Sequence, residues 1–184
     1  GGFEVGGTTD PQYECHNLVT ENPDIVFVTI TYRVSFFGFF HLSHLSDGKD
    51  YQDAPNLGLM DQMMALKWIH ENIAAFGGDP GNVTIWGESA GGASTTFLPL
   101  IKGSHQYFKR VITQSGAPGQ TRSPEQAITC TDKVMEALGC KTVADLKKVS
   151  AEKLAEVWTD LYGFYQKLGI RTFQIGRASC RERV

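Results

Sequence analysis

The sequence lacks an excess of positive charge, a long hydrophobic run and any closely spaced pair of cysteines. Lysine and arginine number 17 against 20 acidic residues, which gives a formal net charge of −3 over 184 residues. A chain of this balance offers no basic face for a phosphate backbone, so we expect no nucleic-acid partner. No apolar stretch reaches the ~20 residues that a transmembrane helix requires, so we expect no membrane span.

The four cysteines, Cys15, Cys130, Cys140 and Cys180, do not show the short intervals of a zinc site. We therefore expect no metal and no other cofactor. Ten residues of helix separate Cys130 from Cys140 by ~15 Å, whereas the Cα atoms of a disulfide lie within ~7 Å of each other. We interpret the cysteines as free thiols packed like small hydrophobic side chains. A reducing compartment fits this interpretation, but a cytoplasmic and a secreted location both stay open.

Both ends of the chain look like cut ends. The sequence has no initiator methionine and opens at Gly1-Gly2-Phe3, which resembles the end of a loop. Residues 175–184 show no periodicity and resemble the translation of a common sequencing-library adapter, although a basic solvated tail is the alternative. We expect one domain at 1–174, truncated at both ends, followed by a non-native tail at 175–184.

Strand-like and helical patterns alternate along the chain. Nearly continuous β-branched and apolar residues predict buried parallel strands, and apolar residues at helical spacing predict amphipathic helices. The predicted strands lie at 24–32, 83–86 and 111–115, and the predicted helices at 57–76, 90–98, 123–138 and 145–158. This alternation predicts an α/β fold with a mostly parallel sheet flanked by helices.

Four phenylalanines surround Gly38, at positions 36, 37, 39 and 40. Aromatic side chains at this density either line a substrate pocket or pack in the core, and core packing is the more common explanation. The sequence leaves both open.

The motif Gly87-Glu88-Ser89-Ala90-Gly91 follows a predicted strand and precedes a predicted helix. G-x-S-x-G in this context is typical of the nucleophile elbow of an α/β-hydrolase, where the serine occupies a sharp turn and its hydroxyl stands clear of the sheet. A Cβ at Gly87 or Gly91 is expected to crowd that turn or to hold strand and helix apart. The motif predicts that Ser89 is an acyl-transfer nucleophile.

A serine nucleophile also needs a base, a carboxylate that orients the base, and amide donors for the oxyanion. The backbone N–H of Ala90 is one expected donor, and Gly1 and Gly2 are typical of a glycine-rich loop that supplies others. In an α/β-hydrolase the acid and then the histidine follow the serine, but His105 is the one histidine after Ser89 and no carboxylate lies between the two. The triad is therefore incomplete, and we expect the chain alone to be inactive.

A longer stretch around the elbow carries a resemblance to a known family. Residues 76–91, Phe-Gly-Gly-Asp-Pro-Gly-Asn-Val-Thr-Ile-Trp-Gly-Glu-Ser-Ala-Gly, resemble the serine signature of the type-B carboxylesterases, which include the cholinesterases. Further blocks resemble the family in the same order, at 31–34, 38–40, 56–62 and 114–116. The resemblance covers roughly residues 1 to 160 and implies a partial α/β-hydrolase fold.

The resemblance implies that the parent protein hydrolyses small-molecule carboxylic esters through an acyl-serine intermediate on Ser89. It places Gly1, Gly2 and Ala90 in the oxyanion hole, and the triad glutamate and histidine beyond residue 184. Two alternatives are an esterase of the hormone-sensitive-lipase type and a non-catalytic, cholinesterase-like adhesion module. The segment Phe-Gly-Gly-Asp-Pro before the elbow disfavours the hormone-sensitive-lipase type. The intact Ser89 disfavours the adhesion module.

The resemblance also implies supporting roles. Arg33 and Asp61 are expected to form a buried ion pair beneath the site, and Glu88 to bond within the polar network of the site. The family often has a second cysteine shortly after the one that corresponds to Cys140, where this chain has Asp145. That departure puts the disulfide in doubt and favours a bacterial-type enzyme over a secreted animal one.

Overall fold

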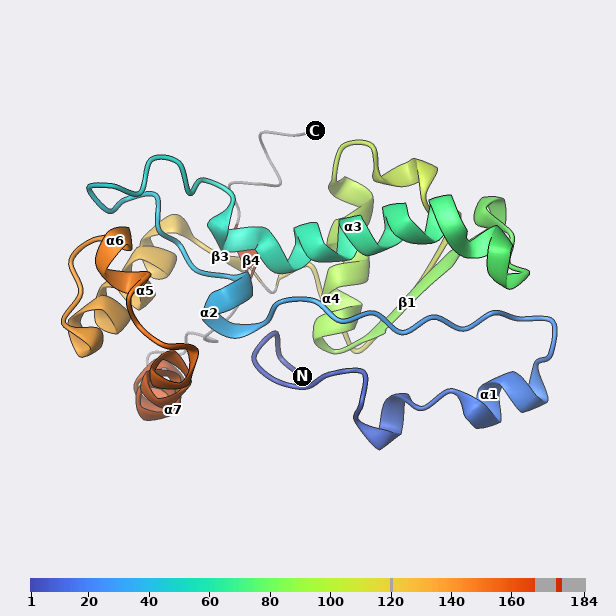
Figure 1. The fold of residues 1–184 in the computed structure, drawn as a ribbon, viewed down its shortest axis with the longest axis horizontal. Coiled ribbons are helices and arrows are strands. Elements are labelled where there is room, and N and C mark those ends of the chain that lie inside the picture. The colour runs from blue at the N-terminus through green and yellow to red at the C-terminus, as the bar shows by residue number, and fades with distance from the viewer. Residues whose placement is uncertain (120, 168–174, 177–184) are drawn as a thin grey trace.

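The computed structural model describes residues 1–119 and 121–167 and the backbone of 175–176, with side chains as far as Leu161. Within this part the helices are α1 (His16–Glu21), α2 (Ser35–Gly38), α3 (Leu57–Asn72), α4 (Ala90–Phe97), α5 (Pro124–Leu138), α6 (Val143–Leu146) and α7 (Ala151–Lys167). The strands are β1 (Thr84–Glu88), β2 (Arg110–Gln114), β3 (Thr121–Arg122) and β4 (Ile175–Gly176). In Figure 1, α5, α6 and α7 gather at the left end of the molecule, and α3 runs from there over β1 and α4.

The strands β1 and β2 form a parallel pair, in register from Thr84 opposite Arg110 to Glu88 opposite Gln114. The connection between them passes through α4, which packs against both strands, as parallel strands require a crossover. The predicted strands at 83–86 and 111–115 are thus confirmed, but the predicted burial of the second is wrong. All five residues of β2 are exposed, because among the described residues the pair has no further strand beside it and no second helical layer.

The segment 24–32, predicted to be a buried parallel strand, is not a strand in the structure. Residues 25–34 have no regular secondary structure, and Ile25 is 50% exposed. Figure 1 shows this segment as an extended ribbon that returns from α1 toward α2. A strand is defined by the ladder it forms with a neighbour, and no described residue pairs with this segment. Its β-branched pattern identified the backbone conformation but not the presence of a partner.

The predicted helix at 57–76 is confirmed. The helix α3 continues as a 3₁₀ turn at Ile73–Phe76, and Gly77 ends it with φ of 82°. Trp68, although apolar, is 49% exposed, and its ring lies beside that of Phe76. The apolar residues that α3 and its 3₁₀ turn bury are Leu59, Leu66, Ile69 and Ile73.

The phenylalanines around Gly38 belong mainly to the core. Phe36, Phe39 and Phe40 are buried, while Phe37 is 44% exposed. Phe3 is buried with them, and its ring meets the ring of Phe39 at a centroid distance of 5.1 Å. The packing interpretation therefore holds for three of the four.

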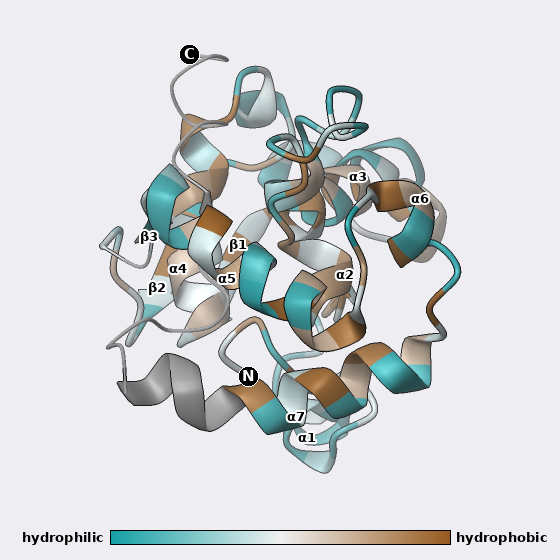
Figure 2. Ribbon diagram, turned by 90° about the vertical axis from the view of Figure 1, so that its left-hand side faces the viewer, coloured by the Kyte–Doolittle hydropathy of each residue, from teal (hydrophilic) through white to brown (hydrophobic). Residues whose placement is uncertain are grey.

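The predicted helix at 123–138 is confirmed with both of its ends. Ser123 and Gln126 form a capping box before α5, and Gly139 closes the helix with φ of 65°. Brown and teal residues alternate along α7 in Figure 2, in the manner of an amphipathic surface helix. No helix within the described residues has the length and apolar character to cross a membrane.

Candidate active site

Ser89 lies on a sharp bend between β1 and α4. Its φ of 53° and ψ of −112° are outside the regions that L-residues ordinarily occupy, and a residue held in this way stores on the order of 1–3 kcal/mol of strain. The bend is held on both sides, because the Ser89 amide donates to the Gln114 carbonyl and the Ala93 amide donates to the Ser89 carbonyl, each at 2.9 Å. Ser89 is partly exposed, and its side chain does not cap the helix. This geometry places Ser89 directly after the carboxyl end of β1.

Close backbone approach explains the glycine at position 87. A Cβ added there lies 2.2 Å from the carbonyl carbon of Gly91, so any side chain at Gly87 forces β1 and α4 apart. The expectation of equal crowding at Gly91 is wrong, since a Cβ there meets nothing within 4 Å. The contribution of Gly91 is its main chain, which lies against Gly87.

A second pair of glycines, missed in the sequence analysis, brings α4 onto the end of β2. A Cβ on Gly92 lies 2.5 Å from the Gln114 carbonyl oxygen, and a Cβ on Gly116 lies 2.2 Å from the Gly92 carbonyl carbon. The signal was present in the doubled glycine after the elbow and in the glycine directly after the predicted strand.

The first turn of α4 begins directly after Ser89. Ala90 is the first residue of α4 and is 4% exposed, and no described residue accepts a hydrogen bond from its amide. The first amides of a helix lack intrahelical acceptors and carry the positive end of the helix dipole. An anion beside Ser89 therefore has a donor available.

The glycine loop at the N-terminus is anchored through its third residue. Phe3 is 2% exposed, and its carbonyl accepts from the Ser35 amide at 2.7 Å. Gly1 and Gly2 are exposed and form a tight turn in which the Gly1 carbonyl accepts from the amide of Glu4 at 3.1 Å. The role of Gly1, Gly2 and Ala90 in an oxyanion hole stays a prediction.

Arg33 and Asp61 form the expected ion pair, but it is not buried. Arg33 Nε and NH2 donate to the two carboxylate oxygens of Asp61 at 2.7 and 2.6 Å, and the Arg33 backbone amide adds a third bond at 2.9 Å. The hydrogen bonds from Arg33 hold the pKa of Asp61 below its ordinary value. The Arg33 side chain is nevertheless 48% exposed, since the described residues do not cover this face.

Glu88 precedes the nucleophile and is exposed. Its carboxylate has no hydrogen-bond partner within the part of the chain that the structure describes, so its place in a polar network stays a prediction.

None of the five histidines, all of which the structure describes, forms a hydrogen bond with Ser89. His105 is exposed in the 3₁₀ turn Ser104–Gln106, and the ring of His70 packs edge-on against Tyr107. His44 pairs with Asp132 of α5 at 2.8 Å, far along the chain from the elbow. The described residues also contain no group of three or more His, Cys, Asp or Glu side chains placed to hold a metal ion.

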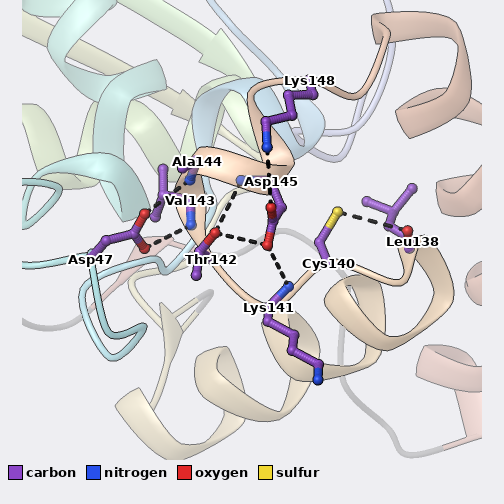
Figure 3. Close-up of polar contacts among 9 residues, drawn as sticks. All are labelled: Asp47, Leu138, Cys140, Lys141, Thr142, Val143, Ala144, Asp145 and Lys148. Atoms are coloured by element: carbon purple, nitrogen blue, oxygen red, sulfur yellow. Dashed lines mark hydrogen bonds and ion pairs between the residues drawn. The ribbon is translucent and has the colours of Figure 1, made fainter.

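Figure 3 shows that Asp145 forms hydrogen bonds where the resemblance suggests a cysteine. Its carboxylate accepts from the Lys141 amide at 3.3 Å and from the Thr142 hydroxyl at 2.8 Å, while the Cys140 thiol points toward the Leu138 carbonyl at 3.7 Å. Cys15, Cys130 and Cys140 form no disulfide, as expected. Of these, Cys130 is buried, and burial raises the pKa of its thiol. Cys180 lies outside the described residues.

Two comparisons of sequence identify the relatives of this chain. The carboxylesterase family matches residues 1–174. The chain is 42% identical over 156 residues to the para-nitrobenzyl esterase of Bacillus subtilis, covering 84% of this chain and 31% of that protein. It is 36% identical over 153 residues to the cholinesterase of Mus musculus, covering 81% of this chain and 24% of that protein.

Solved structures agree with the sequence relatives. The carboxylesterase EST55 of Geobacillus stearothermophilus superposes with a TM-score of 0.83 at 41% identity, over 88% of this chain and 34% of that chain. A structure titled thermophilic PNB esterase gives a TM-score of 0.84 at 37% identity, over 96% of this chain and 36% of that chain. The fold is thus part of an α/β-hydrolase, as predicted, and the chain spans about a quarter to a third of the length of these relatives. It belongs to the carboxylesterase family.

Proposed function

We propose that this chain is the nucleophile-bearing part of a carboxylic ester hydrolase that acts through an acyl-serine intermediate on Ser89. The observation that carries the proposal is the backbone of Ser89, which has a positive φ at the junction of a parallel strand and a helix. Such strain in a non-glycine residue persists where the surroundings enforce it, and it is concentrated at functional sites.

In the proposed reaction, Ser89 Oγ attacks the ester carbonyl carbon while its proton passes to a histidine base. The tetrahedral oxyanion is bound by the Ala90 amide and by the amides of Gly1 and Gly2. Collapse of this intermediate expels the alcohol, which takes the proton from the base, and leaves Ser89 acylated. Water then attacks the acyl group with the same base, releasing the carboxylic acid and restoring the hydroxyl.

The base and its orienting carboxylate are proposed to come from the part of a longer polypeptide that this chain does not include. We propose residues 1–174 as a partial domain, and 175–184 as a non-native tail, although the backbone of β4 pairs with β3. Removal of one triad member leaves about 10³–10⁴-fold catalysis over water, so we expect the 184-residue chain alone to show no useful turnover.

The test is a chimeric esterase in which the part of this chain that aligns with the para-nitrobenzyl esterase over 156 residues replaces the corresponding segment of that enzyme. We expect p-nitrophenyl acetate hydrolysis that Ser89→Ala abolishes without changing the thermal transition of the chimera. A cooperatively folded chimera without activity contradicts the proposal and favours a non-catalytic relative. So does activity that survives Ser89→Ala.

A further inference from the structure

The elbow helix α4 has little of its own to fix its direction. Its first seven residues read Ala-Gly-Gly-Ala-Ser-Thr-Thr, and the first large side chain is Phe97. Glycine and threonine are weak helix formers, and small side chains bury little apolar area. The orientation of α4, and with it that of Ser89 and Ala90, therefore depends on contacts with other elements.

Those contacts come from two sides. On the sheet side, Thr95 and Thr113 share a hydrogen bond of 2.8 Å between their hydroxyls. From α3, Gln62 Nε2 donates to the Ser94 hydroxyl at 3.1 Å. Gln62 and Ser94 are each 3% exposed. Because neither side chain is accessible to water, each depends on the other for its hydrogen bond.

Asp61, the residue before Gln62, is connected to the glycine loop at Gly1 and Gly2. Asp61 binds the backbone amide and the guanidinium of Arg33, as described above. Two residues after Arg33, the Ser35 amide donates to the carbonyl of Phe3, which directly follows Gly2. Two successive residues of α3 thus connect the glycine loop on one side and α4 on the other.

We propose that Gln62 is a positioning residue for the elbow: through Ser94 it fixes α4 against α3, so that the Ala90 amide is aligned with the amides of the glycine loop. This inference rests on the proposed function. Ser94 lies five residues after Ser89, about 7.5 Å along the helix axis, so a small tilt at Ser94 displaces the elbow. Oxyanion donors act over a narrow range of distances, and a displacement of about 1 Å is expected to lower turnover substantially.

The test replaces Gln62 by methionine in the chimera, which keeps the length of the side chain and removes the donor. We expect kcat to fall about 10-fold while KM stays within about twofold, because alignment in the transition state is lost and ground-state binding is not. Gln106→Met is the matched control. It makes the same change in an exposed side chain that bonds to the carbonyl of Gly103 in its own turn, and we expect no effect. If Gln62→Met does not fold, Ser94→Ala removes the same bond from the other side.

The double variant Gln62→Met with Ser94→Ala distinguishes two causes of a lower kcat in the single variants. One is loss of the positioning of α4, and the other is destabilisation by a buried polar group left without a partner. With no orphaned hydroxyl, the stability of the double variant is expected to recover, whereas kcat is expected to stay low. Recovery of kcat together with stability overturns the proposal, and so does an unchanged kcat in both single variants.

Hydrogen exchange gives a readout that does not need turnover. The Ala93 amide bonds across the elbow to the Ser89 carbonyl, and we expect its exchange to be about 10-fold faster in Gln62→Met and unchanged in Gln106→Met. Unchanged exchange in Gln62→Met contradicts the inference even where the chimera is inactive. An inactive parent chimera with faster exchange in the variant contradicts the proposed function while the positioning of α4 by Gln62 stands.

Discussion

The elbow and the extended segment 24–32 both carry strong sequence patterns, but the extended segment does not form the paired, buried strand that its pattern predicts. At the elbow, the close contact of Gly87 with Gly91 is made by residues four positions apart, and the strand β2 adds a bond from its Gln114 carbonyl to the Ser89 amide. The extended segment has the composition of a buried strand, yet Ile25 and Val28 remain about half exposed. The sterics of the bend are set by nearby glycines and its distant partner β2 is present, whereas the extended segment has no neighbouring strand among the described residues.

The largest loss of stability is expected at Gly87, where the main chains of β1 and α4 are in direct contact. Gly87→Ala places a Cβ 2.2 Å from a main-chain carbon, and we expect it to lower the free energy of unfolding by about 3 kcal/mol or more. Gly91→Ala is the control in the same motif, and we expect it to be neutral or stabilising by up to about 1 kcal/mol, because the site is open and alanine favours helix. Urea denaturation measures both. Equal losses at the two positions contradict the geometry of the elbow.

Replacing an isoleucine by alanine, once in the paired strand β1 and once in the extended segment 24–32, compares how much each region contributes to stability. Ile85 of β1 is 8% exposed and Ile25 is 50% exposed. We expect Ile85→Ala to cost about 2–4 kcal/mol and Ile25→Ala less than about 0.5 kcal/mol in the same denaturation experiment. A large loss at Ile25 means that the extended segment is covered in solution.

The strain at the nucleophile predicts a smaller effect of opposite sign. Ser89→Gly permits the positive φ without the steric cost of a Cβ, so we expect it to raise the free energy of unfolding by about 1 kcal/mol relative to Ser89→Ala. Both variants lack the hydroxyl, but only the alanine variant keeps the Cβ. The difference in stability between them therefore measures the strain of the positive φ. If the two variants are equally stable, the bend is not strained.

The smallest effect is a pH dependence far from the elbow. Burial, and then the charges of His44 and Arg122, hold the pKa of His41 below its ordinary value of 6.5. The unfolded chain then takes up a proton at higher pH than the folded chain does, so this stabilisation is complete above pH 6.5 and is lost as the pH falls through the folded pKa. We expect the loss of stability between pH 7.5 and 5.5 to be smaller in His41→Gln, and unchanged in His105→Gln, an exposed control. Identical profiles in all three proteins contradict this account of His41.

Local rules made most of the fold predictable. The caps at Ser123 and Gly139, the end of α3 at Gly77 and the serine bend follow from residues close in sequence. Predictions that required a covering layer were wrong, as for the burial of β2 and of the pair between Arg33 and Asp61. The bond between Gln62 and Ser94 was not predicted, because a polar residue at a core position of a helix does not show which residue, 32 positions away, accepts its hydrogen bond.

The most direct test of the account is covalent labelling of the chimera with a fluorophosphonate, mapped by mass spectrometry. We predict stoichiometric phosphonylation of Ser89, with ester hydrolysis lost in proportion to labelling. A label on another residue, or hydrolysis that persists in fully labelled protein, contradicts the assignment of Ser89 as the nucleophile.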